Sequence, residues 1–76
     1  AVLSVIVEKR ESAEKLNAHL SAFGDCIVGR MGIPYREKGV SVLCVVLDAP
    51  PSAINALTGR IGQLDGVSAK TLFSQY

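Results

Sequence analysis

The chain has 76 residues, enough for one domain, and its eight Lys and Arg against seven Asp and Glu leave a net charge of +1. That balance lacks the clustered basic excess with which proteins neutralise several phosphates, so the sequence predicts no direct nucleic-acid binding. Hydrophobic residues make up 49% of the chain and the mean hydropathy is +0.33, which is more apolar content than one small core requires. We therefore expect part of the apolar surface to contact another subunit.

The apolar stretches are too short to cross a membrane, because a spanning helix needs about 20 consecutive apolar residues. Arg30, Arg36 and Asp48 interrupt the longest candidates. Residues 1–7, AVLSVIV, lack the basic segment that opens a secretion signal and are typical of a strand. These features predict a cytoplasmic protein without a membrane partner.

The first half of the chain predicts a strand, a helix and a second strand. Residues 2–8 are apolar on both faces and favour a central strand. Ser12 is placed to cap a helix and Gly24 to end it. The stripe at helical spacing between them consists of Ala13, Leu16, Leu20 and Phe23. Residues 25–33 follow as a weaker strand that Pro34 should end, since proline cannot donate a ladder hydrogen bond.

The second half predicts a strand, a helix and a last strand. Turn residues from Arg36 to Gly39 should form a hairpin with residues 40–47, which are apolar on both faces except at Ser41. Pro50-Pro51 opens the second helix and Asp65-Gly66 stops it. Its buried stripe consists of Ile54, Leu57, Ile61 and Leu64. The chain closes with a strand of mixed polarity, residues 67–73, which fits a sheet edge.

The order βαββαβ predicts one α+β domain over residues 1–76 with a ferredoxin-like, split βαβ fold. Right-handed crossovers give an antiparallel sheet of strand order 4-1-3-2 with both helices on one face. The two most apolar strands then lie in the centre, in agreement with their polarity. Their second face has no helix to cover it, so we expect an apolar surface there that another subunit covers.

The hairpin also predicts how the two cysteines lie. If Arg36 faces Gly39, the numbers of facing residues sum to 75, so Cys44 faces Met31. Cys26 is then five positions further along the strand, and at about 3.4 Å per residue that offset exceeds the reach of a disulfide. We expect two reduced thiols.

The sequence shows no catalytic residues and no metal or cofactor site. His19 is the only histidine, whereas a metal site needs several converging ligands. Two cysteines eighteen positions apart cannot hold an iron-sulfur cluster or act as a closely spaced thiol pair. Residues 40–47 lack the stacking aromatics of an RNA-recognition module. Residues 9–12 lack the glycine of a phosphate cradle, which argues against acyl-phosphate hydrolysis.

Two segments supply the candidate ligand-binding residues, which are Arg30, Arg36, Gly59 and Arg60. The two arginines at the end of the second strand are either solvated edge charges or ligand contacts. Gly59 and Gly62 interrupt a helix at a cost of up to about 1 kcal/mol each. Either this helix closely approaches the first helix or a neighbouring subunit, or Gly59 admits an anion beside Arg60.

Residues 30–37, RMGIPYRE, and residues 57–67, LTGRIGQLDGV, give the chain its family resemblance. The chain resembles, over nearly its whole length, the small ACT-like proteins named putative iron-only hydrogenase system regulators. The resemblance implies a ferredoxin-like regulatory domain that assembles as a dimer or higher oligomer and is linked by name to iron-only hydrogenase. The chain departs from metal-sensing relatives because His19 stands alone, and it lacks the glycine with which amino-acid-binding ACT domains often begin their first helix.

Two functional hypotheses follow. The leading one is a non-catalytic regulatory module that acts as a homodimer or tetramer, with a small effector between subunits. The alternative is a purely structural protein-interaction module without a small-molecule ligand.

Overall fold

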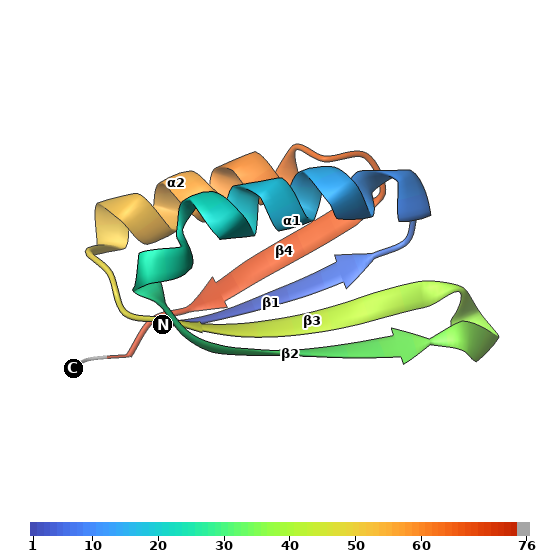
Figure 1. Cartoon of the computed structure of the whole chain (residues 1–76), viewed down its shortest axis with the longest axis horizontal. Coiled ribbons are helices and arrows are strands. Elements are labelled where there is room, and N and C mark those ends of the chain that lie inside the picture. Colours follow the sequence, from blue (N-terminus) through green and yellow to red (C-terminus); the bar gives the residue numbers. More distant parts are fainter. Residues whose placement is uncertain (75–76) are drawn as a thin grey trace.

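The computed structural model describes residues 1–74. Its elements are β1 (Val2–Val7), α1 (Ala13–Ala22), β2 (Ile27–Tyr35), β3 (Val40–Leu47), α2 (Pro51–Gly62) and β4 (Val67–Leu72). The strands form one antiparallel sheet of order β2-β3-β1-β4, and both helices lie on the same face of it (Figure 1). The predicted ferredoxin-like, ACT-like fold is therefore confirmed, since 4-1-3-2 is the same order counted from the opposite edge.

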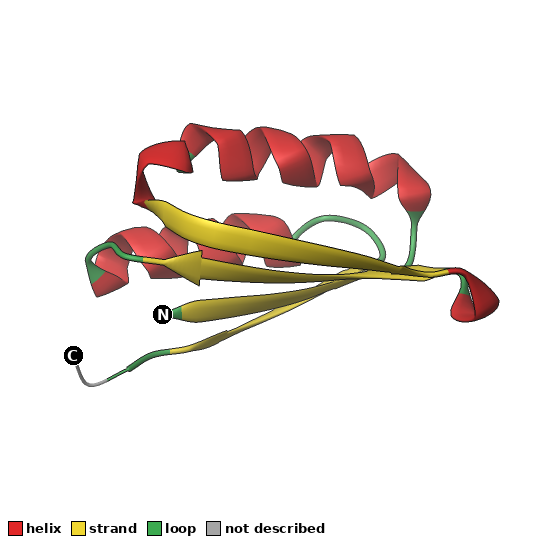
Figure 2. Ribbon diagram, turned by 60° about the horizontal axis from the view of Figure 1, so that its bottom comes forward, coloured by secondary structure: helices red, strands yellow, loops and turns green. Residues whose placement is uncertain are grey.

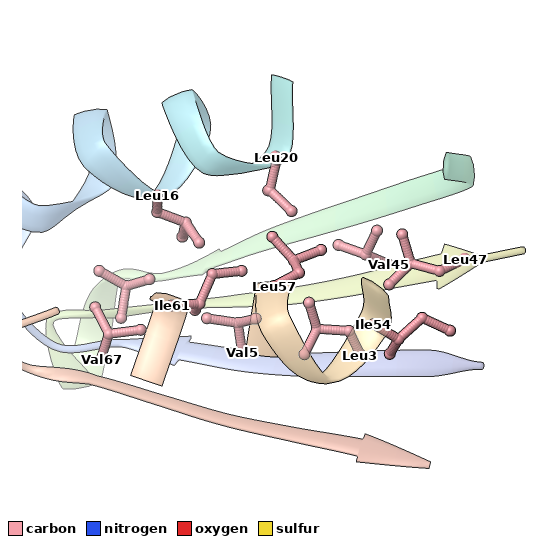
Figure 3. Close-up of a cluster of buried hydrophobic side chains, with 11 residues drawn as sticks. Leu3, Val5, Leu16, Leu20, Val45, Leu47, Ile54, Leu57, Ile61 and Val67 are labelled. Carbon is pink, nitrogen blue, oxygen red and sulfur yellow. The ribbon is translucent and has the colours of Figure 1, made fainter. Parts of the chain in front are cut away.

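The core fills the space between the sheet and the two helices (Figure 3). Alternate residues of β1, beginning with Leu3, point into it, and the helical stripes meet them. The buried apolar residues are Leu3, Val5, Val7, Leu16, Leu20, Val45, Leu47, Ile54, Leu57, Ile61 and Val67. Each contributes roughly 1.5 to 3 kcal/mol by leaving water. These contacts fix the helices over one face only.

The ends of α1 lie where the sequence predicted them but differ in detail. Ser12 occupies the N-cap position, but its backbone is already helical in the short 3-10 turn Arg10–Ser12, and its side chain makes no capping hydrogen bond. Its buried hydroxyl instead donates to the carbonyl oxygen of Asp65 at 2.6 Å. Gly24 follows the helix as expected, although it opens a second 3-10 turn (Gly24–Cys26) rather than taking a left-handed conformation.

The hairpin of β2 and β3 has the predicted register. Tyr35 pairs with Val40 and Met31 with Cys44, whereas Cys26 precedes β2. The turn is a 3-10 turn closed by Gly39, whose φ is +67°. The prediction that Pro34 ends the strand is wrong, because β2 continues to Tyr35. The strand forms the outer edge of the sheet, where a missing backbone donor leaves no neighbour unpaired.

The connection after β1 packs against the connection before β4. Lys9 Nζ lies 2.6 Å from Asp65 Oδ2, and the backbone N–H of Glu8 donates to the carbonyl oxygen of Gly66 at 2.7 Å. Gly66 has a φ of +69°, in the left-handed region where a Cβ is unfavourable. Together these contacts fasten the two connections to each other at one end of the domain.

The hairpin of β2 and β3 extends past the start of α1 (Figure 1). Figure 2 shows the same hairpin continuing beyond the helical layer and the twist that the sheet acquires along it. Its two strands therefore present a part of their helix-side surface that α1 does not cover. No helix within residues 1–74 is long and apolar enough to cross a membrane.

Candidate functional site

The sheet presents an apolar surface on the side away from the helices, which we call the open face. The strand registers place on it the side chains that alternate with the core residues. The apolar ones are Val2, Ile6, Met31, Ile33, Tyr35, Val40, Val42, Cys44, Val46 and Leu72, and the polar ones are Ser4, Ser68 and Lys70. Met31 is 60% exposed and Ile33 is 52% exposed, so no part of the described chain covers them. The predicted second apolar face is therefore present.

The open face carries almost no charge. Among the strand residues of the described chain that share it, Lys70 is the charged one, and it lies at the β4 edge opposite Ser4. The central strands β1 and β3 contribute valine, isoleucine and cysteine side chains together with the uncharged Ser4. An apolar surface of this kind on a small domain is typical of an interaction site.

A second feature lies on the helix side of the sheet, between the start of α1 and the hairpin. It is a cleft of about 260 Å³, which we call the arginine cleft. Three arginines line it, from three separate segments: Arg10 before α1, Arg30 in β2 and Arg36 in the hairpin turn. The Arg30 guanidinium donates a hydrogen bond of 3.2 Å from Nη2 to Asn17 Oδ1. The cleft thus gathers cations from segments that are far apart in the sequence.

Most of the remaining lining is apolar, and its polar side chains are Asn17, Tyr35 and Ser41. Val7 and Leu16, both buried, and the half-buried Leu43 belong to the wall of the cleft. No aspartate or glutamate is among the lining residues in the described chain. Guanidinium groups stay protonated throughout the physiological range. The arrangement can therefore bind an anion, but its charged groups cannot exchange protons as general acids or bases.

The ion pair recorded within residues 1–74 lies elsewhere, between Lys9 and Asp65. Their hydrogen bond, together with the attraction between the two charges, raises the pKa of Lys9 above its ordinary value. The same hydrogen bond and attraction lower the pKa of Asp65. Both side chains are largely exposed. The pair helps to hold the two connections together, and the Asp65 carboxylate does not line the arginine cleft.

The structure brings two of the four predicted ligand-binding residues together. Arg30 and Arg36 line the arginine cleft, whereas Gly59 and Arg60 lie exposed on α2 and do not line it. A Cβ at Gly59 or Gly62 would have no atom within 4 Å. Close approach of α2 to α1 at these glycines, one of the predicted alternatives, is therefore wrong. Approach of a neighbouring subunit stays a prediction.

Arg10 and Asn17 were not among the residues predicted from the sequence. Arg10 lies two residues after the first predicted strand, and the pairing of Val7 with Ser41 brings the end of that strand beside the hairpin. Combining the hairpin register with the pairing of the first and third strands would therefore have indicated that Arg10 lies near the hairpin. Asn17 lies on the polar side of the first helix, and only the three-dimensional arrangement shows that this side meets Arg30.

Comparison with known proteins identifies the family. The family model described as "TM1266-like: Iron-only hydrogenase system regulator, putative" matches residues 1–71. The chain belongs to the TM1266-like family. This confirms the resemblance that the two sequence segments indicated, and the family is named for regulation rather than for an enzyme activity.

Solved structures agree with this membership. The uncharacterised protein TM1266 from Thermotoga maritima is similar to this TM1266-like chain with a TM-score of 0.90 and 32% identity, over 93% of this chain and 90% of that one. A formyltetrahydrofolate deformylase from Pseudomonas putida KT2440 matches with a TM-score of 0.70 and 13% identity, over 99% of this chain and 29% of that one. The second likeness concerns the fold alone. No match was found among curated protein sequences.

Proposed function

We propose that this TM1266-like chain is a non-catalytic regulatory domain that acts through self-association on its open face, as a dimer or a tetramer, and responds to a small effector. The observation that carries the proposal is the open face itself. Its central strands are as apolar on this side as on the core side, yet Ile6 remains 43% exposed and Val46 41% exposed. Covering such side chains stabilises an assembly by roughly 25 cal/mol for each Å² of apolar area removed from water.

A second copy of the same chain is the partner that suits this face. In a two-fold symmetric dimer the same patch meets itself, so a patch rich in one charge would repel its copy. The open face avoids this repulsion because Lys70 stands at its edge rather than at its centre. Dimerisation through edge strands is the rival geometry. It would leave Ile33 and Val46 in water, whereas self-association on the open face removes both from it.

A regulatory role without catalysis is supported by the family name and by the chemistry of the cleft. Three guanidiniums bind and orient anions but do not transfer protons near neutral pH. Within residues 1–74, no group of three or more His, Cys, Asp and Glu side chains is arranged to hold a metal ion. These features favour a domain that binds and assembles.

Two neighbouring valines of β3 test the proposal, because their side chains point to opposite faces. Val45 is fully buried against the helices and Val46 lies on the open face. We expect Val45→Lys to unfold the domain, since it places a charge in the core. Val46→Lys should instead leave the circular dichroism spectrum folded and lower the mass measured by light scattering.

Each outcome of this pair has a definite meaning. A folded Val46→Lys variant with the wild-type oligomeric mass would contradict self-association on the open face and favour the edge strands. If wild type is oligomeric but no amino acid, nucleotide or metal ion raises its Tm in a thermal-shift screen, the purely structural interaction module replaces the regulatory one. Each variant differs from wild type by one side chain and carries the same substitution, so the two variants differ only in the face of the sheet that receives the charge.

A further inference from the structure

We infer that the arginine cleft binds a small organic anion, a carboxylate or a phosphate ester that carries an apolar group. The inference assigns a site and a chemical class to the effector, and it rests on the proposed function for the regulatory consequence of binding. The binding itself requires the residues of one chain only, because all three arginines and the apolar wall come from the same protomer.

The charge of the cleft is the first argument. Arg10, Arg30 and Arg36 line one cleft of about 260 Å³, with no carboxylate in the lining and no ion pair to any of the three in the described chain. Like charges gathered without a counter-charge repel one another and create a positive potential. An anion that enters the cleft relieves that repulsion. Arginine also matches the geometry of carboxylate and phosphate oxygens, because it can donate two parallel hydrogen bonds.

The wall of the cleft is the second argument. The three arginines are exposed, but they share the cleft with the buried side chains of Val7 and Leu16 and the half-buried Leu43. This apolar part of the wall has no use for inorganic phosphate and favours an apolar group attached to the anion, while Asn17 and Ser41 add polar groups to the same lining.

The restrained Arg30 side chain and the volume of the cleft further limit the class of ligand. Asn17 accepts a hydrogen bond from Arg30 at 3.2 Å and so restrains that guanidinium at the cleft. Restraining a charged side chain before binding reduces the entropy lost on binding. The volume of about 260 Å³ lies below the roughly 300 to 1,000 Å³ of sites for drug-sized ligands. The cleft therefore suits a small metabolite and is too small for a dinucleotide.

Nuclear magnetic resonance titration of the ¹⁵N-labelled full chain tests the inference with four probes. Phenylacetate and phenyl phosphate represent the two anion types, phenylacetamide is the neutral counterpart of phenylacetate, and inorganic phosphate lacks the apolar group. We expect saturable shifts of the backbone amides of Arg30, Gly39, Ser41 and Leu43 with at least one organic anion. Phenylacetamide should give none, and inorganic phosphate should bind at least about tenfold more weakly.

Two arginine variants supply the matched comparison. Arg36→Gln should weaken binding of the organic anion by about tenfold or more, because a hydrogen bond to a charged group is lost. Arg60→Gln removes the same charge from an exposed position on α2 outside the cleft and should leave the affinity unchanged. Equal weakening by both variants would show that net charge alone attracts the anion, and it would overturn the inference.

The remaining outcomes are also decisive. No saturable shift in the cleft with either organic anion would overturn the inference, and so would equal binding of phenylacetamide and phenylacetate. Light scattering on the same samples separates this inference from the proposed function. A monomer that binds the anion would support the anion site in the arginine cleft and contradict self-association. An oligomer that binds none of the probes would contradict the anion site and support self-association.

Discussion

Replacing Gly66 with alanine tests the connection between α2 and β4. The φ of +69° at this position places the residue in the left-handed region, which costs a residue with a Cβ about 1 to 2 kcal/mol. A Cβ would also lie 2.6 Å from Lys9 Cγ and 2.9 Å from Lys9 Cβ. Lys9 would have to move away, and its hydrogen bond to Asp65 would be strained or lost. We expect Gly66→Ala to lower the free energy of unfolding by about 1 to 3 kcal/mol.

Thermal unfolding followed by circular dichroism measures this effect, at one fixed protein concentration because an oligomer's Tm depends on concentration. For a domain of this size each kcal/mol corresponds to a change in Tm of roughly 4 to 8 °C. Gly59→Ala is the matched control. Gly59 lies within α2 with open space where a Cβ would go, so alanine should stabilise the helix by up to about 1 kcal/mol.

The two glycine variants should therefore shift Tm in opposite directions. An unchanged or higher Tm for Gly66→Ala would refute the conformation assigned to Gly66. A Gly59→Ala variant that is destabilised and loses oligomeric mass would instead show that α2 approaches a neighbouring subunit at this glycine, as one of the sequence-based alternatives holds.

Three further predictions concern the core, the ion pair and the thiols. Leu57→Ala, at a fully buried position, should lower the free energy of unfolding by about 2 to 5 kcal/mol in urea titrations; a loss below 1 kcal/mol, on the order of a surface change, would contradict the core packing. Because the pKa of Asp65 is held below 3.8 and that of Lys9 above 10.5, Asp65→Asn should be less stable than wild type between these values, and the difference should vanish as pH falls through the lowered pKa or rises through the raised one. A difference that persists in strong acid would refute this linkage. Thiol titration of the denatured, unreduced protein should find two free thiols, those of Cys26 and Cys44. A protein with no free thiol would overturn the hairpin register.

The sequence was sufficient for the features that depend on local pattern. The apolar residues on both faces of residues 40–47 predicted a central strand, and the stripe through Leu57 predicted which side of α2 is buried. The structure confirms both. The turn chemistry predicted the pairing of Met31 with Cys44. Even the open face followed from counting which faces the helices can cover.

The features that escaped prediction depend on segments distant in sequence. Ser12 occupies the N-cap position of α1 but makes no capping hydrogen bond, because its hydroxyl donates to the carbonyl oxygen of Asp65, 53 residues away. Pro34 stays in a strand because β2 is an edge, a position that the predicted strand order implied but that the local rule for proline did not take into account. Arg10 joins the candidate cleft only when β1 is placed beside β3. In each case the deciding contact is tertiary, so local propensity gave the wrong residue or none.

The mass of the wild-type chain in solution tests the central proposal most directly. Size exclusion coupled to light scattering, at micromolar protein concentration and neutral pH, reports the mass independently of shape. Self-association on the open face predicts at least twice the 8.0 kDa of a single chain, with a mass that falls on dilution if association is weak. A folded chain that elutes with a mass of 8.0 kDa at every concentration would contradict it.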